Sequence, residues 1–191
     1  FRLLKNDSGF AINEYVGNAS KVNIPSYISN FYINSIGDSA FENCYNIKSV
    51  IIPDSVTSIG SFAFGDCASL RSIVVPESVT NIGDYAFSRC TNLEKVCWNA
   101  KCVDDFEFQS NLFYNSGTSS SGIDFVFGDT VERIPKYLCY GVPAKKDSKP
   151  PKELSGFYQW LPVDVENDSG DGYYMMYQDA LTGKNISVEI I

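Results

Sequence analysis

A pattern that recurs every 23 residues constrains this chain more than any other feature of its sequence. Three segments align without a gap, and they begin at Ile33, Val56 and Val79. A period of about 20–29 residues is typical of solenoids, in which each repeat forms one coil. One coil cannot bury its own apolar face, so a continuous core requires stacked neighbours. The spacing therefore predicts a stack of coils.

Each coil contains a short segment in which core-facing and outward-facing residues alternate. In most coils a proline ends this segment, and Gly128 takes the place of the proline in the last one. In the central repeat we expect Ile73 and Val75 to face the core and Val74 to lie on the outer face. Pro76 ends this strand because it has no N–H group to donate to a ladder. We predict one short parallel strand per coil, near Val22–Ile24, Val50–Ile52, Ile73–Val75, Val96–Trp98 and Phe125–Phe127.

The remainder of each coil begins at an Ile-Gly pair that recurs in all three repeats. Gly83 permits a tight bend, and Ala86 and Phe87 are predicted to follow on a single helical or 3₁₀ turn. One strand and one such turn per coil define an α/β solenoid. Phe64 holds the position of Phe87 in the central coil, so we expect it at the centre of the core.

The flanks of the array depart from the repeat. Residues 1–32 are predicted to form an N-terminal hairpin cap and a first degenerate coil, and residues 33–141 contain the repeats. An insertion near 100–123 is rich in glycine and serine, which favours a loop bulging from one rim. Residues 142–156 have the composition of a linker, and residues 157–191 form a C-terminal β cap or the start of another domain.

The tail contains two patterns of its own. Residues 173–177 and 186–190 bracket a turn sequence at 182–185, and this arrangement predicts a hairpin. The acidic run at 164–172 fails the calcium-loop pattern because Ser169 stands where the obligatory glycine belongs. We expect a solvated turn there and no metal site.

The recurring motif Ile-Gly-x-x-Ala-Phe-x-x-Cys-x-x-Leu, followed by a strand ending in Ile-Pro or Val-Pro, resembles the BspA-like leucine-rich-repeat family of bacterial surface proteins. The resemblance covers residues 9 to about 141, because residues 9–17 are similar to the family's lead-in hairpin. It implies an exported protein that is extracellular or at the cell surface, with its signal peptide outside this chain. Some members act as adhesins, and the family offers no catalytic residues. Cys139 at the phenylalanine position, the insertion and the tail depart from the pattern.

Composition excludes several classes of function. A formal net charge of −8 argues against a nucleic-acid partner, because phosphate binding needs a cationic surface. The absence of histidine excludes Ser-His-Asp and Cys-His catalysis and any zinc site that uses histidine. No apolar run has the roughly 18 residues of a membrane span. We predict no cofactor, no metal and no membrane insertion within this chain.

The cysteines follow the repeat. Cys44, Cys67 and Cys90 share one position in successive coils, so we expect a ladder of reduced, buried thiols. Their parallel Cβ directions disfavour a disulfide, which needs the two Cβ atoms to converge. Cys97 and Cys102 lie close together after the last regular coil, and a bridge between them stays open as an alternative.

Ile51, Val74 and Cys97 occupy the same outward strand position in successive coils, and this column of side chains is the candidate binding surface. If the array curves like a horseshoe, this column lines its inner sheet, which solenoids commonly use for binding. Two interpretations stay open: the column binds a partner, or the tail or a neighbouring domain covers it. The candidate partner-binding residues are Lys48, Ile51, Arg71, Val74, Glu94 and Cys97.

Three functions compete. The leading hypothesis is a non-catalytic, adhesin-like module that binds a protein or cell-surface ligand. The second is a structural spacer that carries another domain. The third, least favoured, is a hydrolase that uses carboxylates of the tail, which would need two facing carboxyl groups in a pocket. An uncovered apolar column favours binding, whereas a polar or covered column favours the spacer.

Overall fold

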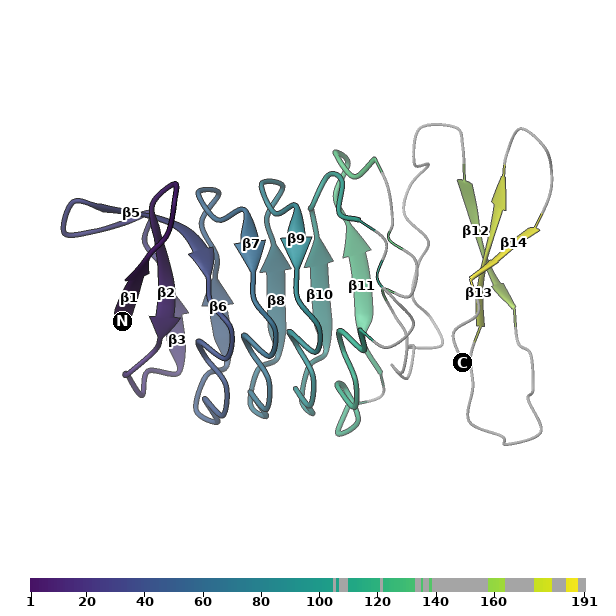
Figure 1. Cartoon of the computed structure of the whole chain (residues 1–191). Coiled ribbons are helices and arrows are strands. Elements are labelled where there is room, and N and C mark those ends of the chain that lie inside the picture. The colour runs from purple at the N-terminus through teal and green to yellow at the C-terminus, as the bar shows by residue number, and fades with distance from the viewer. Residues whose placement is uncertain are drawn as a thin grey trace.

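The computed structural model shows coils stacked side by side in a row (Figure 1). The described residues contain strands and turns but no helix. The solenoid is therefore confirmed, and the helical part of the α/β prediction is wrong for the described part of the chain. The structure describes residues 1–104, 106, 110–120, 122–132, 135 and 138, and the backbone of 158–163, 174–179 and 185–188.

One parallel sheet contains the strands that the repeat predicts. Its order is β11-β10-β8-β6-β3, and every neighbouring pair is parallel. Ser72 pairs with Ser49 on one side and with Lys95 on the other, so successive coils align in the register of the repeat. The bounds are β3 (Lys21–Asn23), β6 (Ser49–Ile51), β8 (Ser72–Val75), β10 (Lys95–Trp98) and β11 (Asp124–Phe127).

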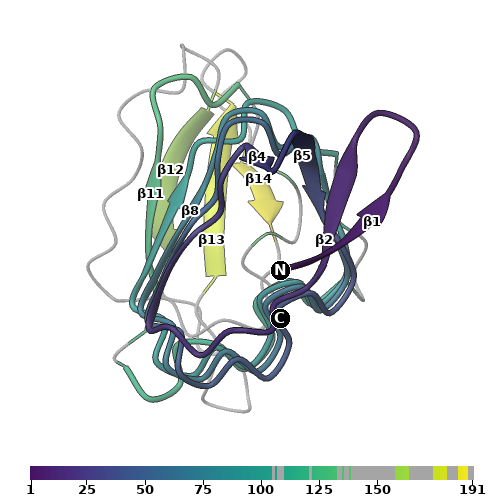
Figure 2. The same ribbon diagram turned by 90° about the vertical axis from the view of Figure 1, so that its left-hand side faces the viewer.

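A second sheet forms another side of the coils, as the view down the stack shows (Figure 2). Its order is β1-β2-β5-β7-β9, and the second and third repeats contribute only two-residue strands to it. The prediction of one strand per coil is therefore incomplete, because strands this short show no detectable alternation. The bounds are β1 (Arg2–Lys5), β2 (Phe10–Glu14), β4 (Tyr27–Ile28), β5 (Phe31–Ile36), β7 (Ser58–Ile59) and β9 (Asn81–Ile82).

Consecutive turns, and not a helix, connect the second sheet to the first. The Phe62 and Phe64 N–H groups donate to the Asp84 and Ala86 carbonyls of the next coil, at 3.0 and 2.8 Å. These groups would bond within the segment if it were helical. Phe62 has a φ of 54°, in the left-handed region, and this conformation recurs at the same position of each coil. Bonds between coils therefore replace the predicted helical turn.

Gly83 has a different role from the predicted one. Its φ is not positive, so the bend itself does not require glycine. A Cβ atom at Gly83 would lie 2.5 Å from the backbone nitrogen of Ser61 in the preceding coil. Gly60 meets the backbone of Asp38 in the same way, at 2.5 Å. The repeating glycine is needed because neighbouring coils approach closely at this position.

Two hairpins precede the regular coils. β1 and β2 pair antiparallel, and β2 then continues the second sheet by pairing with β5. β4 and β5 pair antiparallel and form a second hairpin, which extends past the N-terminal end of the row in Figure 1. Tyr27, Phe31 and Tyr32 are exposed on it. The chain thus begins with antiparallel pairing and changes to parallel stacking at β5.

A ladder of phenylalanine rings runs along the core. Phe41, Phe64, Phe87 and Phe113 are completely buried, one from each successive coil. Their ring centroids are separated by 4.9, 5.5 and 5.2 Å in that order, and each pair is stacked. The predicted central position of Phe64 is therefore confirmed, and its ring contacts the coils on both sides.

The cysteine ladder differs from the prediction at its first member. Cys67 and Cys90 are buried, and their thiols donate to the Phe41 and Phe64 carbonyls at 3.2 Å each. Cys44 is only partly buried. It lies in the first regular coil, which the preceding segment joins through the bond from the Tyr15 N–H group to the Ala40 carbonyl at 2.7 Å. The expectation of burial is therefore wrong for Cys44, while all three thiols are free.

The insertion is a coil of its own, which corrects the prediction of a rim loop. The Phe87 N–H donates to the Leu112 carbonyl at 2.9 Å, the bond that Phe64 makes to Ala86. Ser116 takes the cysteine position, and its hydroxyl donates to the Phe87 carbonyl at 2.6 Å. β11 then pairs with β10 in register. The buried Leu112 and Phe113 explain why this segment packs into the stack.

The tail contributes a separate three-stranded sheet. β12 (Tyr158–Val163), β13 (Tyr174–Asp179) and β14 (Asn185–Val188) pair antiparallel in that order. The β13–β14 pair corresponds to the predicted hairpin, and β12 adds a strand that the sequence pattern does not indicate. The predicted linker, the acidic run at 164–172 and Cys139 lie outside the described residues.

Candidate functional site

The outward face of the first sheet presents a row of apolar side chains. Alternation along each strand buries Ile73 and Val75 and turns Val74 outward. Ile51 is 62% exposed and Val74 43% exposed, and Cys97 is partly exposed beside them. The register places these three side chains on consecutive coils. The structure therefore brings together the apolar residues that the sequence analysis selected.

Val126 extends this row and was not among the selected residues. It pairs with Cys97 in the parallel register and is 41% exposed. Asn23 occupies the corresponding position on β3, so a polar residue ends the row at the N-terminal side. We name Ile51, Val74, Cys97 and Val126 the apolar stripe. The sequence contained the signal for Val126, since Phe125–Phe127 was predicted as a strand.

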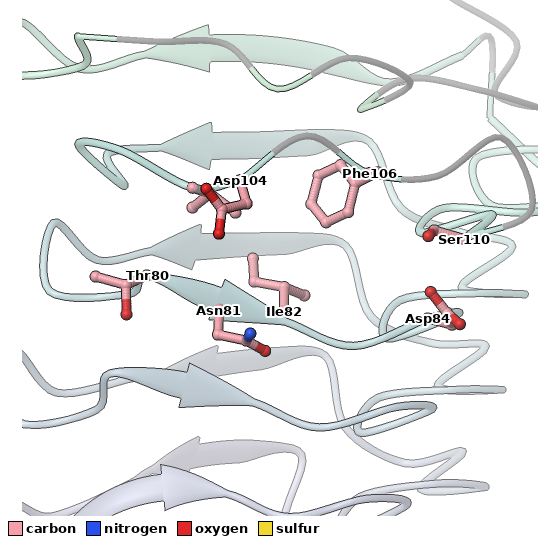
Figure 3. Close-up of a pocket in the computed structure, with 8 residues that line it drawn as sticks. Thr80, Asn81, Ile82, Asp84, Asp104, Phe106 and Ser110 are labelled. Carbon is pink, nitrogen blue, oxygen red and sulfur yellow. The ribbon is translucent and has the colours of Figure 1, made fainter.

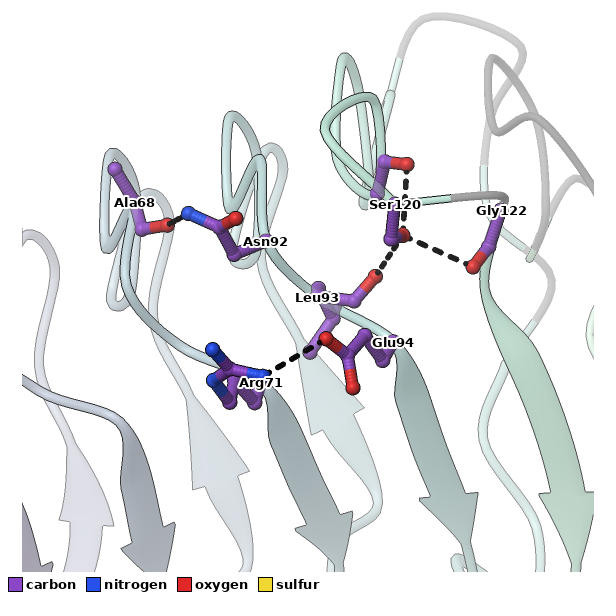
Figure 4. A network of polar contacts seen from close by, with 8 residues as sticks. Ala68, Arg71, Asn92, Leu93, Glu94, Ser120 and Gly122 are labelled. Carbon is purple, nitrogen blue, oxygen red and sulfur yellow. Dashed lines mark hydrogen bonds and ion pairs between the residues drawn. The ribbon is translucent and has the colours of Figure 1, made fainter.

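The charged residues predicted beside the stripe lie just before the strands. Lys48 is exposed, and Arg71 forms an ion pair with Glu94 at 3.1 Å (Figure 4). Both members of the pair are more than half exposed, so solvent screening leaves the pair with little effect on stability. All three predicted charged residues therefore lie at the solvent-exposed edge of the face, where they can contact a partner.

Polar contacts between coils fix the position of this edge. The Asn92 side chain donates to the Ala68 carbonyl at 2.6 Å, and the Ser120 hydroxyl donates to the Leu93 carbonyl at 3.2 Å (Figure 4). Ser120 belongs to the segment first expected to be a loop. Its hydrogen bond therefore joins the coil formed by the insertion, which is three residues longer than the others, to the residues just before β10.

Acidic residues dominate the opposite edge, just after the strands. Asp54, Glu77 and Asp129 are exposed there on three coils. Lys101 lies among them and pairs with Glu132 at 3.0 Å; hydrogen bonding to Glu132 raises the pKa of the lysine. The apolar stripe thus runs between an edge with lysine and arginine and an edge rich in carboxylates.

The thiols of Cys44, Cys67 and Cys90 lack the lowered pKa of a reactive cysteine. Burial raises the pKa of Cys90 to about 12, and burial also raises the pKa of Cys67 and of Cys44. A nucleophilic cysteine needs the opposite shift, because the thiolate is the reactive form. Cys97 and Cys102 are free thiols, so the bridge considered between them is absent.

A pocket of about 390 Å³ lies beside β9 in the second sheet (Figure 3). Ile82, Val103 and Phe106 provide its apolar lining. Asp84 and Asp104 lie at opposite ends of it, and neither belongs to the tail where a carboxylate pair was considered. Thr80, Asn81 and Ser110 also line it. Sequence reasoning missed this pocket because it assigned residues 100–123 to a loop outside the stack.

The structure adds two observations on metals and membranes. Within the described ranges, no group of three or more cysteine or acidic side chains is arranged to hold a metal ion. Among the same residues there is no helix with the length and apolar character of a membrane span.

Comparison with known proteins identifies the repeat. The family model for the BspA type leucine-rich repeat region matches residues 12–145, in six copies. A leucine-rich repeat protein from Bacteroides capillosus is 22% identical, with a TM-score of 0.51 over 66% of this chain and 98% of that one. Another, from Eubacterium ventriosum, is 16% identical, with a TM-score of 0.50 over 89% of this chain and 54% of that one. These likenesses show the fold. No curated protein matches the chain.

Proposed function

Because the chain belongs to the BspA-type leucine-rich-repeat family, we propose that it is a non-catalytic protein-binding module of a bacterial cell-surface or secreted protein. Its partner is a protein or a cell-surface ligand, and the apolar stripe is the centre of the binding surface. Proteins with this type of repeat are typical of bacterial surfaces, and leucine-rich repeats generally mediate protein interactions. The family is generally non-catalytic, which supports the same assignment.

The exposure of the stripe is the observation that carries this proposal. Ile51, Val74 and Val126 keep between two fifths and two thirds of their surface in contact with solvent. A contiguous apolar row on a folded sheet usually marks an interaction site, because its burial against a partner is favourable. A spacer has no need for such a row, so this exposure favours binding over the spacer hypothesis.

The two charged edges give the surface the anatomy of a protein interface. Interfaces combine an apolar centre, which carries most of the energy, with a polar rim that excludes water and sets orientation. Here Lys48 and the Arg71–Glu94 pair border one side of the stripe, and Asp54 and Glu77 border the other. This arrangement supports a partner with an apolar ridge flanked by charges of both signs.

The test compares two valine substitutions at exposed positions. Val74→Asp places a carboxylate at the centre of the stripe, whereas Val16→Asp places one at a 57% exposed site outside the strands of the first sheet. The immobilised full chain is incubated with extracts of host-cell surface proteins and of co-resident bacteria. We expect the captured proteins to be lost with Val74→Asp and retained with Val16→Asp.

Thermal melts of the same variants separate binding from folding. Both melting temperatures are expected to stay close to that of the unsubstituted chain, because neither side chain belongs to the core. Equal capture by all three proteins would contradict the proposal and favour the spacer. A large drop in stability with Val74→Asp alone would indicate that the stripe is covered, because the carboxylate would then be buried.

A further inference from the structure

Opposite charges lie at equal distances from the apolar stripe in the coil of β6. Ile51 follows Lys48 by three residues and precedes Asp54 by three. Lys48 and Asp54 are both exposed. The strand thus has a positive charge before it and a negative charge after it, and the stripe residue is halfway between them along the chain.

The coil of β8 repeats this arrangement. Val74 follows Arg71 by three residues and precedes Glu77 by three, and both charged residues are exposed. The parallel register of β6 and β8 aligns the two coils. Over these two coils the face therefore has a positive edge, an apolar centre and a negative edge.

The coil of β10 carries the same pattern with the signs exchanged. Glu94 precedes Cys97 by three residues, and Lys101 follows it by four. Both charged residues are exposed, and each also forms an ion pair within its own chain. On each of three consecutive coils, the two edges of the face thus carry opposite charges.

This face is complementary to itself under one two-fold rotation. If the axis runs along the row of coils, centred on the stripe, it exchanges the two edges and sets each coil opposite its counterpart. Lys48 then faces Asp54, and Arg71 faces Glu77. If the axis runs along the strands, each edge faces itself, and every placement of the axis from β6 to β10 opposes at least one pair of like charges. The charges therefore favour the axis along the row.

We propose that the partner of the apolar stripe is a second copy of this chain, packed face to face about a two-fold axis along the row of coils. The inference rests on the proposed function, because it gives that binding surface its partner. Val74 packs against Val74 of the second copy, where burial of apolar surface is favourable. Arg71 keeps its pair with Glu94, because a guanidinium has five N–H donors and can also bind Glu77 of the second copy.

The size of the face sets the strength of the dimer. Five strands about 4.8 Å apart form a row roughly 20 Å long. Interfaces of this small size, which bury less than about 1,200 Å², are typically weak. We therefore expect a dimer that forms at micromolar chain concentrations and dissociates on dilution.

Sedimentation equilibrium of the full chain tests the charge pairing. Lys48→Glu should weaken the dimer roughly tenfold, because two contacts per dimer change from attraction to repulsion. Adding Asp54→Lys to the same chain should restore the affinity, since the pair forms again with its signs exchanged. Lys5→Glu, on β1 of the second sheet, is the matched control for net charge and should have no effect. A double variant that associates no more tightly than Lys48→Glu would overturn the proposal.

Cys97 provides a second measurement, because the axis sets it opposite Cys97 of the second copy. In a chain with Cys102→Ser and Cys139→Ser, a short bismaleimide should join two copies through Cys97, as peptide mapping would identify. A chain with Cys97→Ser that keeps the exposed Cys102 should give little of the joined product. Failure to join Cys97 to Cys97 at concentrations where the dimer forms would overturn the proposed axis.

Self-association and capture of other proteins are measured on the same variants, so the two proposals can fail separately. Val74→Asp should abolish the dimer, because it sets two carboxylates against each other, and Val16→Asp should leave it intact. If the unsubstituted chain stays monomeric while Val74→Asp still abolishes capture, this inference fails and the proposed function stands. If Val74→Asp changes neither self-association nor capture, both fail.

Discussion

The ring of Phe64 stacks on the ring of Phe41 in the preceding coil, with centroids 4.9 Å apart and planes inclined by only 15°. Phe87 stacks on the other side of Phe64, at 5.5 Å. Phe64 therefore joins three coils through one side chain. Because each coil is stabilised mainly by its neighbours, the loss of such a contact is felt along the whole array.

Phe64→Ala should be among the most destabilising single substitutions in the repeats. Truncating a buried phenylalanine typically costs about 3–5 kcal/mol, since it removes apolar contacts and leaves a cavity. Chemical denaturation measures the change. Tyr45→Ala is the control, because Tyr45 is exposed, and it should cost about 1 kcal/mol or less. Similar losses for the two variants would show that the ring ladder does not support the stack.

Gly83→Ala tests the close approach of neighbouring coils. The new Cβ atom would lie 2.5 Å from the Ser61 backbone nitrogen, so one of the two coils has to shift. At Gly65 the nearest atom, the Phe62 carbonyl oxygen, would be 3.2 Å away. We expect the melting temperature to fall clearly more for Gly83→Ala than for Gly65→Ala. The reverse order would contradict a packing role for the repeating glycine.

Alkylation of the native protein should separate the thiols by their place in the fold. Cys102 is exposed and Cys97 partly exposed, so both should react with iodoacetamide at neutral pH. Cys67 and Cys90 should resist, because they are buried and burial raises the pKa of each thiol. Cys44 should react at an intermediate rate. Peptide mass mapping over time gives the order, and early labelling of Cys90 would be incompatible with the ladder.

The same thiols predict a loss of stability at alkaline pH. Burial raises the pKa of Cys90 to about 12 in the folded chain, so above the ordinary thiol pKa only the unfolded chain loses this proton. The folded state then binds more protons than the unfolded state, and stability falls as pH rises toward 12. Below the ordinary thiol pKa this contribution is fully present.

Cys90→Ser isolates that contribution. Ser116 already occupies the equivalent position one coil later and donates to the Phe87 carbonyl, so serine fits the ladder. The variant should lose less stability between pH 8 and pH 11 than the unsubstituted chain, when both are followed by thermal melts. Identical pH profiles would mean that the Cys90 thiol makes no contribution in this range.

The sequence predicts the features that depend on apolar periodicity and misses those that depend on neighbouring coils. The strand around Val74 follows from alternation alone. The left-handed turn at Phe62 does not, because its N–H groups bond to the next coil and no pattern within the segment records this. The two-residue strands β7 and β9 are too short for alternation to identify.

The longer coil shows a second limit. Phe113 and Ser116 lie 26 residues after Phe87 and Cys90, so an alignment without gaps at the shorter period passes over them. The spacing of Phe113 and Ser116 is the same as that of Phe87 and Cys90, and this shared spacing could have identified the insertion as a coil. The same omission hid the pocket beside β9 and left Val126 out of the stripe, although the strand that carries Val126 was predicted.

The most direct test of the proposed binding surface uses methyl signals. The full chain, labelled at isoleucine and valine methyl groups, is titrated with the partner recovered by affinity capture. We expect shifts or broadening at Ile51, Val74 and Val126, while Val16, exposed and outside the strands of the first sheet, stays unchanged. Unperturbed stripe signals in the presence of a bound partner would contradict the account.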